Sequence, residues 1–253
     1  MYTHIKGVQI LISLLKQFNI SHVVLSPGTR NTALAGSIEN DPFFHCYSIV
    51  DERSAGYFAL GLSEALDEPV CVSCTAATAT CNYLPAMKEA YERNIQLVAL
   101  TADQNPYEMF HMEDQCIDQV DMFHGYVKLA VDVPKVMNDA DYWYCNRRMN
   151  EAFLELDHHG KGPIQINYHM SYDLNEISTY DVEELPVTRK IDRYEINADF
   201  AEFANMLSSK KRIMVVGGSE FTEDGKLRRA INTFTEKYNA RVFPRSCYKL
   251  STG

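Results

Sequence analysis

The sequence predicts an α/β fold, in which a parallel β-sheet carries helices on both faces and is followed by the start of a second α/β domain. Apolar runs typical of strands alternate with helical patterns along almost the whole chain. The runs are nearly continuous, as in parallel strands that are covered on both faces. With 253 residues, 46% of them hydrophobic, the chain is long enough for one large domain and part of another.

The first half of the chain begins with a helix over about 4–18, because Val8, Ile12 and Leu15 recur with helical spacing. A turn at Pro27 and Gly28 opens the second helix. Short apolar runs predict the strands, and longer segments rich in Ala and Leu predict the helices. After the first helix we expect strand 22–26, a helix to about 39, strand 43–50, helix 53–66, strand 69–74 and a helix to about Arg93.

The second half continues this alternation with longer loops. Strand 95–102 ends in a polar loop, "DQNPYEMFHMEDQ". A strand near 126–133, a helix over about 138–157 and strand 162–168 follow. These elements complete a first domain, for which we predict the boundaries 1–175.

Residues 171–195 are acidic and polar with little periodicity, and we expect 176–195 to be a surface linker. A new alternation of helix and strand patterns follows, with helix 197–208, strand 212–218, helix 223–238 and then "ARVFPRS". We assign 196–253 to the N-terminal part of a truncated second α/β domain. The stretch "VVGGSE" at 215–220 suggests a nucleotide-binding turn, but without GxGxxG this signal is weak.

Composition narrows the classes of partner. A formal net charge of −10 disfavours nucleic acid or an anionic membrane, since both need basic patches. No apolar run approaches the roughly 20 residues of a membrane span, and the N-terminal helix lacks a signal-peptide cleavage site. We therefore expect a cytoplasmic protein whose partners are small-molecule substrates.

The seven cysteines are scattered, which indicates reduced thiols instead of a disulfide framework. Cys71 and Cys74 form a CxxC, but in a strand such positions face opposite sides, so a shared metal or a redox pair is not expected. The eight histidines include no HExxH and no zinc spacing with cysteine. We predict no metal ligand within these residues.

Ligands of open parallel sheets bind beyond the carboxyl ends of the strands, so the residues that leave each strand are the candidates for a site. Five such exits occur: "SPGTR", "VDER", "CTAAT", "TADQNP" and "NYHM". Taken alone, the charged run Asp51–Arg53 at the second exit also fits an ordinary solvated turn. Asp51 is in a position to cap the following helix.

Four of these segments together resemble a known family. In order they are "SPGTRNTAL" (26–34), "DERSAGYFALGLSEALDEPVCVSCTAATA" (51–79), "LTADQNP" (100–106) and "QCIDQVDMF" (115–123). They are similar to the N-terminal pyrimidine-binding domain of thiamine-diphosphate enzymes, over roughly residues 1–170. Within that superfamily they most resemble the 2-succinyl-5-enolpyruvyl-6-hydroxy-3-cyclohexene-1-carboxylate synthases of menaquinone biosynthesis.

The resemblance implies the thiamine-diphosphate-binding fold and thiamine diphosphate as cofactor. In that family a middle domain follows, and then a domain that holds the diphosphate through Mg²⁺. No GDG with a distant Asn occurs in this sequence. The Mg²⁺ ligands are therefore expected in a C-terminal domain outside residues 1–253.

The resemblance also implies that Glu52 is the catalytic carboxylate that meets N1′ of the aminopyrimidine ring. In this family the base that removes the thiazolium C2 proton is the cofactor's own 4′-imino group. Forming that group requires a partner at N1′ that shares a proton. A Glu in an apolar, partly dry cleft can do this, whereas Asp is shorter and Gln cannot accept the proton.

Substrate contacts are implied for Thr29, Arg30, Gln104 and Gln115. Thr29 and Arg30 match a Ser/Thr-Arg pair that helps bind a substrate carboxylate, and backbone amides at a helix start would support an anion there. A surface ion pair is the alternative for Arg30. Gln115 matches a Gln close to the reacting centre, and its alternative is to satisfy loop backbone.

Three departures from the family pattern bear on the site. Where the family has Ser-Gly-Thr beside the pyrimidine, this chain has Ala76, Ala77 and Thr78, and Ala77 adds a methyl group and restricts φ. Gln104 stands where the family has an Arg, and Asp114 where it has an Asn. The cofactor contacts expected for Ala77 and Thr78 survive these changes better than the substrate contacts do.

The resemblance thus predicts a thiamine-diphosphate-dependent 2-oxo acid decarboxylase and carboligase. In the family's reaction, 2-oxoglutarate loses CO₂ and the acyl-anion equivalent adds to isochorismate. A homodimer or homotetramer is implied, because the family places the cofactor between subunits. One alternative is a related enzyme with a different 2-oxo acid or acceptor. Another is a non-catalytic interaction module with the same fold.

Overall fold

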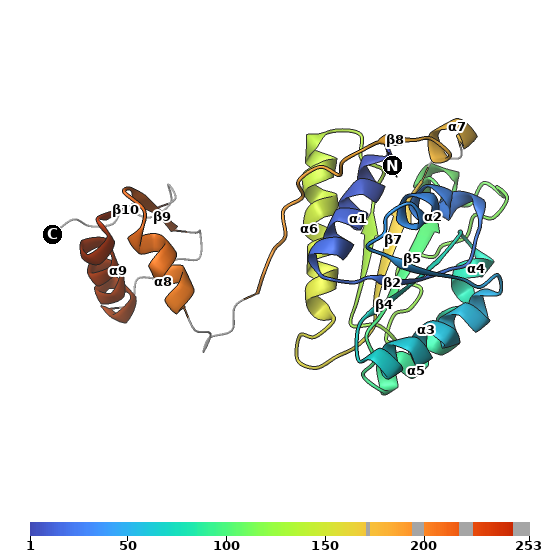
Figure 1. The fold of residues 1–253 in the computed structure, drawn as a ribbon, viewed down its shortest axis with the longest axis horizontal. Coiled ribbons are helices and arrows are strands. Elements are labelled where there is room, and N and C mark those ends of the chain that lie inside the picture. The colour runs from blue at the N-terminus through green and yellow to red at the C-terminus, as the bar shows by residue number, and fades with distance from the viewer. Residues whose placement is uncertain (171–172, 194–199, 218–224, 245–253) are drawn as a thin grey trace. The chain divides into compact units, whose positions relative to one another are not determined.

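The fold is that of a computed structural model, which describes residues 1–170, 173–193, 200–217 and 225–244 (Figure 1). The chain forms two compact units, Met1–Arg193 and Tyr194–Gly253, and each is described by itself. The first unit includes most of the segment 176–195 that the sequence suggests as a linker.

A six-stranded sheet forms the centre of the first unit. Its spatial order is β3-β2-β4-β5-β7-β6, and every neighbouring pair is parallel. The predicted α/β fold with a parallel sheet is confirmed. The strands are β2 (His22–Leu25), β3 (His45–Ser48), β4 (Val70–Cys74), β5 (Leu97–Asp103), β6 (Leu129–Val133) and β7 (Ile164–His169).

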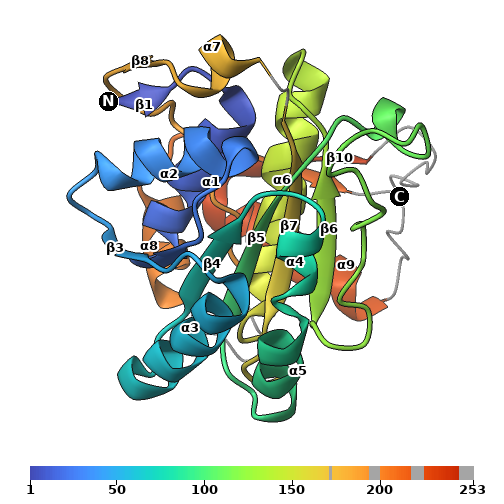
Figure 2. The ribbon, with the colours of Figure 1, turned by 90° about the vertical axis from the view of Figure 1, so that its right-hand side faces the viewer.

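Helices cover both faces of this sheet, as Figures 1 and 2 show. Two separate apolar clusters lie between sheet and helices, because successive strand side chains point to opposite faces. Cys71 belongs to one cluster and Cys74 to the other, and both are free thiols. The helices of the first face are α1 (Lys6–Gln17), α2 (Thr32–Glu39) and α6 (Asp139–Glu155), and those of the second are α3 (Glu52–Leu66), α4 (Thr78–Cys81) and α5 (Leu84–Glu92).

The strand order creates two places where connections leave in opposite directions. β2 lies between β3 and β4, so the chain passes to one side of β2 and then returns on the other. At the other edge the chain passes from β5 to the edge strand β6 and then turns back to β7, which lies between them. Such switch points, at the carboxyl ends of the strands, are where open α/β sheets bind ligands. They organise the candidate site.

The chain that follows β7 stays attached to the first unit. The added elements are α7 (Leu174–Ile177) and β8 (Tyr180–Val182), which pairs antiparallel with β1 (Tyr2–Thr3). Farther on, Nδ2 of Asn150 in α6 donates to the Arg189 carbonyl at 3.0 Å, and Oδ1 of Asn150 accepts from the Ile191 amide at 2.7 Å. Side-chain amides of the domain, more than buried apolar residues, hold this segment, which explains its polar sequence.

The described part of the second unit is a small α/β arrangement. Two strands, β9 (Ile213–Gly217) and β10 (Ala240–Pro244), pair in parallel. The helices are α8 (Ala201–Ser208) and α9 (Gly225–Tyr238). Residues 218–224 and 245–253, with the end of "VVGGSE" and with Cys247, lie outside the described residues. Within the described ranges, no helix has the length and apolar character needed to cross a membrane.

Candidate functional site

Glu52 is the first residue of α3, at the start of the helix that follows β3. Asp51 caps this helix as expected, because its carboxylate accepts from the Ser54 amide at 2.8 Å and from the Ser54 hydroxyl at 2.7 Å. Glu52 itself is half-buried. Burial raises the pKa of the Cys74 thiol to about 12, and the charge of Glu52 adds to this rise. The Glu52 carboxylate thus contributes to the electrostatic surroundings of Cys74, the last residue of β4.

The exits of β2 and β4 touch each other. A Cβ on Gly28 would lie 2.5 Å from Cβ of Thr75, so no larger residue fits there without displacing Thr75. The Arg30 amide donates to Oγ1 of Thr75 at 3.3 Å. The first switch point therefore holds the "SPGTR" and "CTAAT" turns in direct contact.

Two of the predicted substrate residues lie together although 85 positions separate them. Nη1 of Arg30 donates to Oε1 of Gln115 at 2.9 Å. Arg30 is 5% exposed, whereas Gln115 is exposed. Thr29, which begins the short 3₁₀ helix Thr29–Asn31, is half-buried beside them. Arg30 is thus a buried guanidinium that donates a hydrogen bond to an exposed amide.

Ala77 adopts a conformation that favours glycine. Its φ is +66° and its ψ is −125°, directly before α4. Its amide donates to Oε1 of Gln119 at 2.8 Å, and both residues are buried. Thr78, the first residue of α4, is exposed. The turn thus keeps a glycine-type backbone although the residue is Ala.

We expect Ala77→Gly to stabilise the protein. A non-glycine residue in such a region costs about 1–3 kcal/mol, and the extra freedom of glycine in the unfolded chain costs roughly 0.5–1 kcal/mol. The net gain should be about 1 kcal/mol, a rise in Tm of about 2–4 °C for a chain of this size. Ala79→Gly, inside α4, is the matched control and should lower Tm. A fall in Tm for Ala77→Gly would show that the backbone at this turn is not strained.

Gln104 does not present its side chain to solvent. It is 6% exposed, and its Nε2 donates to the Asp114 carbonyl at 2.6 Å. Its amide donates to Oδ1 of Asp103 at 2.7 Å. Gln104 therefore anchors the loop that carries Asp114 through this hydrogen bond, and its neutral side chain supplies no positive charge at the end of β5.

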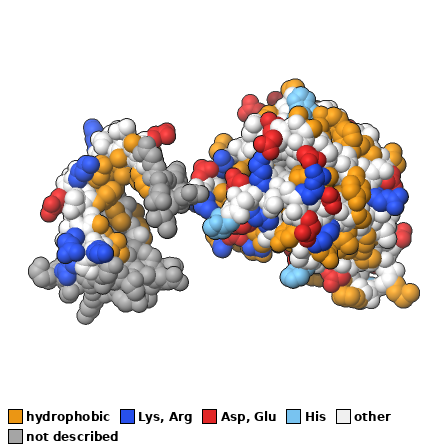
Figure 3. All heavy atoms as spheres, turned by 90° about the horizontal axis from the view of Figure 1, so that it is seen from below, with side chains coloured by type: hydrophobic (Ala, Val, Ile, Leu, Met, Phe, Trp, Pro, Cys, Tyr) orange, Lys and Arg blue, Asp and Glu red, His pale blue; other side chains and the backbone are white. Residues whose placement is uncertain are grey.

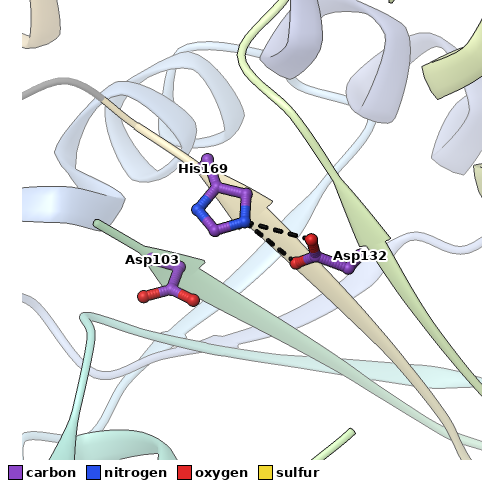
Figure 4. A group of neighbouring side chains, drawn as sticks. All are labelled: Asp103, Asp132 and His169. Carbon is purple, nitrogen blue, oxygen red and sulfur yellow. Dashed lines mark hydrogen bonds and ion pairs between the residues drawn. The ribbon is translucent and has the colours of Figure 1, made fainter. Parts of the chain in front are cut away.

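A cluster that the sequence analysis missed lies at the second switch point. Asp103, Asp132 and His169 come from the ends of β5, β6 and β7, and Figure 4 shows the imidazole ring between the two carboxylates. One ligand atom of each lies within 4.8 Å of the others, close enough to share a metal ion. However, Nδ1 of His169 already faces the Gln104 carbonyl, and Nε2 lies 3.0 Å from Oδ1 of Asp132. The cluster is therefore a hydrogen-bonded ion group.

The geometry favours a doubly protonated His169. Both ring nitrogens face oxygen acceptors, and only the imidazolium can donate to both. Burial alone lowers the pKa of His169, but the hydrogen bonds to Asp132 and to the Gln104 carbonyl, with the charges of Asp132 and Asp103, raise it overall. Burial raises the pKa of Asp132, but the bonds from His169 and Asn167 bring it below its usual range.

This shift predicts a pH dependence of stability. Because the folded-state pKa of His169 lies above its ordinary value of 6.5, its contribution is complete below about pH 6.5 and is lost as pH rises through the folded pKa. His169→Gln keeps the carboxylates and removes this titration. Urea unfolding of both proteins between pH 6 and pH 9 should show the wild-type advantage shrinking as pH rises. A constant difference would mean that His169 is neutral in the folded state.

Buried amides join this cluster to the Ala77 turn. Nδ2 of Asn167 donates to Asp103 at 2.8 Å and to Asp132 at 2.7 Å, and Nε2 of Gln119 donates to Oδ1 of Asn167 at 2.7 Å. The sequence carried a signal for this network. In "PIQINYHM" the polar residues Gln165, Asn167 and His169 alternate with apolar ones, so they share one face of β7.

Comparison with known proteins fits this architecture. Residues 5–122 match the family described as "Thiamine pyrophosphate enzyme, N-terminal TPP binding domain". A 2-succinyl-5-enolpyruvyl-6-hydroxy-3-cyclohexene-1-carboxylate synthase from Bacteroides fragilis is 40% identical over 222 residues, which cover 86% of this chain and 40% of the relative. The synthase of the same name from Staphylococcus aureus is 34% identical over 229 residues, covering 86% of this chain and 39% of the relative.

The chain therefore spans about two fifths of the length of the curated relatives it matches. Among solved structures, benzoylformate decarboxylase from Polynucleobacter necessarius aligns with a TM-score of 0.58 at 20% identity, over 96% of this chain and 43% of that one. At that identity the likeness shows the fold alone. Through residues 5–122, this chain belongs to the family of thiamine pyrophosphate enzyme N-terminal TPP binding domains.

Proposed function

We propose that this chain forms the pyrimidine-binding part of a thiamine-diphosphate-dependent enzyme that decarboxylates a 2-oxo acid and transfers the remainder to an acceptor. The substrates that the resemblance favours are 2-oxoglutarate and isochorismate. The observation that carries the proposal is the position of Glu52. A half-buried carboxylate begins α3, close to the end of β4, in a chain that belongs to a cofactor-binding family.

The residues at this edge fit an aminopyrimidine ring. Glu52 would exchange a proton with N1′ of the ring, and its buried neighbours Cys74 and Tyr83 give it a partly apolar surrounding. Ala77 and Thr78 would contact the ring from the β4 exit. When bound, the cofactor supplies the electron sink, while the protein supplies orientation and excludes water. Mg²⁺ is proposed to bind the diphosphate through residues outside this chain.

Arg30 and Gln115 are the proposed substrate contacts, with Thr29 beside them. The guanidinium is buried at the first switch point, where a carboxylate would form a charge-assisted hydrogen bond in low dielectric. The neutral Gln104 side chain is bonded to the Asp114 carbonyl, so Gln104 itself offers the substrate no positive charge. This favours the alternative of a different 2-oxo acid or acceptor more than the family pattern alone does.

Self-association is part of the proposal, as a homodimer or homotetramer. Large apolar side chains are exposed near the site, with Val50 77%, Phe110 89% and Met112 99% exposed. Figure 3 shows one view of the molecule, in which hydrophobic side chains gather on the first unit between charged ones. We further propose a cytoplasmic location, where thiols stay reduced, since the cysteines within the described ranges are all free.

The test is release of CO₂ from 2-oxo acids by the intact protein with thiamine diphosphate and Mg²⁺. We expect 2-oxoglutarate to be preferred to pyruvate, and isochorismate to be consumed in step with CO₂ release. Turnover of another 2-oxo acid alone would support the related-enzyme alternative. Failure to bind thiamine diphosphate would contradict the proposal and favour a non-catalytic module.

A further inference from the structure

We propose that Gln119, oriented by Asn167, is a positioning residue that holds the Ala77 turn in the conformation that meets the cofactor. This inference rests on the proposed function, because it takes the β4 exit as the place of the aminopyrimidine. Gln119 and Asn167 are 0% and 1% exposed, so neither can touch a ligand without rearrangement. Their effect must pass through the turn.

Gln119 joins two parts of the sheet edge. Its Oε1 accepts from the Ala77 amide at 2.8 Å, and its Nε2 donates to the Ala102 carbonyl at 3.0 Å and to Oδ1 of Asn167 at 2.7 Å. Its own carbonyl accepts from Nε2 of Gln165 at 3.4 Å. One side chain thus bridges the exit of β4 to the ends of β5 and β7.

The direction of these hydrogen bonds is determined at the far end. Asp132 accepts from His169 and from Asn167, so the amino group of Asn167 must face the carboxylates. The side-chain oxygen of Asn167 then faces Gln119, so Gln119 must donate to it from its amino group. The remaining oxygen of Gln119 is therefore left facing the Ala77 amide, which is a donor.

Hydrogen bonds of the Thr101 hydroxyl further restrict the orientation of Asn167. Oγ1 of Thr101 donates to Oδ1 of Asn167 at 2.9 Å and accepts from Nε2 of Gln165 at 3.1 Å. Asn167 therefore has partners on its oxygen and its nitrogen, and rotation of either amide would place like groups together. Within the described residues Oε1 of Gln165 has no hydrogen-bond partner, but the amides of Asn167 and Gln119 are bonded at both ends, and this makes the pair rigid.

The consequence falls on Ala77. Its φ of +66° is unfavourable for a residue with a Cβ, so the conformation must be held by its surroundings. The hydrogen bond from the Ala77 amide to Oε1 of Gln119 stabilises this backbone conformation directly. Without this bond we expect the turn to relax and the contact surface for the cofactor to change shape.

The test combines two measurements on the intact protein, amide hydrogen exchange at Ala77 and the Kd for thiamine diphosphate with Mg²⁺. Gln119→Met removes the amide at similar volume, and should speed exchange at Ala77 at least about tenfold and raise the Kd about tenfold. Asn167→Asp, which does not touch Ala77, should produce the same changes in smaller measure. Asn150→Leu is the control, since Asn150 is an equally buried amide on the opposite face of the sheet.

The outcomes separate the two proposals. Unchanged exchange at Ala77 in Gln119→Met would overturn the inference, and so would faster exchange with an unchanged Kd, since Gln119 would then be only structural. If Gln119→Met fails to fold, Gln119→Asn keeps the amide but shortens its reach and gives the same test. Failure of the wild-type protein to bind the cofactor would instead contradict the proposed function, and exchange alone would then judge whether Gln119 holds the turn.

Discussion

Replacing Glu52 by Gln in the intact protein should lower turnover at least about a hundredfold, within the usual range for loss of a proton-transfer group. Gln has the same shape but cannot take a proton from N1′ of the cofactor. Because the helix cap belongs to Asp51 and Glu52 is only half-buried, folding should be nearly unaffected. Steady-state kinetics with saturating cofactor would measure the effect, and thermal unfolding would confirm the fold.

Glu68→Gln is a matched control, since Glu68 is an exposed carboxylate just beyond the other end of α3. It should leave kcat within about twofold of wild type. If the kcat of Glu52→Gln also stays within about twofold of wild type, Glu52 has no catalytic role, and residues 51–53 form an ordinary solvated turn.

Arg30→Ala should weaken kcat/KM for a 2-oxo acid with a distal carboxylate by about tenfold to a hundredfold, and should affect pyruvate less. A charge-assisted hydrogen bond in a closed site contributes roughly 1.5–3 kcal/mol, and each 1.4 kcal/mol is a factor of ten. The guanidinium is 5% exposed and oriented by Gln115, so it is well placed to form such a bond. The experiment compares 2-oxoglutarate with pyruvate in both proteins.

Arg53→Ala removes an exposed guanidinium from the first turn of α3 and serves as the control. This variant should change kcat/KM for 2-oxoglutarate and for pyruvate only slightly, and by the same factor. Equal losses for both substrates in Arg30→Ala would assign Arg30 to the structure of the β2 and β4 exits, where its amide already bonds Thr75.

Much of the fold could be predicted because parallel strands have a simple sequence pattern. The runs at 69–74 and 95–102 are almost wholly apolar, and they became β4 and β5 at the centre of the sheet. The pattern failed where burial does not determine structure. β8 (Tyr180–Val182) is short and half-exposed, and its strand conformation comes from backbone pairing with β1 and not from burial of an apolar run.

The place of a candidate site residue in the fold could be predicted from local pattern where the residue follows a strand directly. Glu52 and Arg30 lie at strand exits, which a sequence can locate. The bond between Arg30 and Gln115 depends on how a long loop returns to the sheet, and no local pattern encodes that. The positive φ of Ala77 was also hidden, because Ala is not a residue that usually indicates such a backbone.

The ion cluster was missed for a different reason. Asp132 was a single polar residue within the apolar strand β6, and its meeting with His169 depends on β6 and β7 being neighbours. Strand order was not part of the sequence prediction. The alternation of Gln165, Asn167 and His169 did indicate a polar face on β7, and it could have identified half of the network.

The central claim is that Glu52 activates thiamine diphosphate, and exchange of the cofactor's C2 proton tests it without any assumption about the substrate. The intact protein, its Glu52→Gln variant and free cofactor would be compared in D₂O, with the C2 proton followed by NMR at saturating Mg²⁺. We expect the wild-type protein to accelerate exchange over free cofactor, and Glu52→Gln to slow it at least about a hundredfold relative to wild type. Equal exchange rates for the wild-type protein and the variant, with the cofactor bound to both, would contradict this role of Glu52.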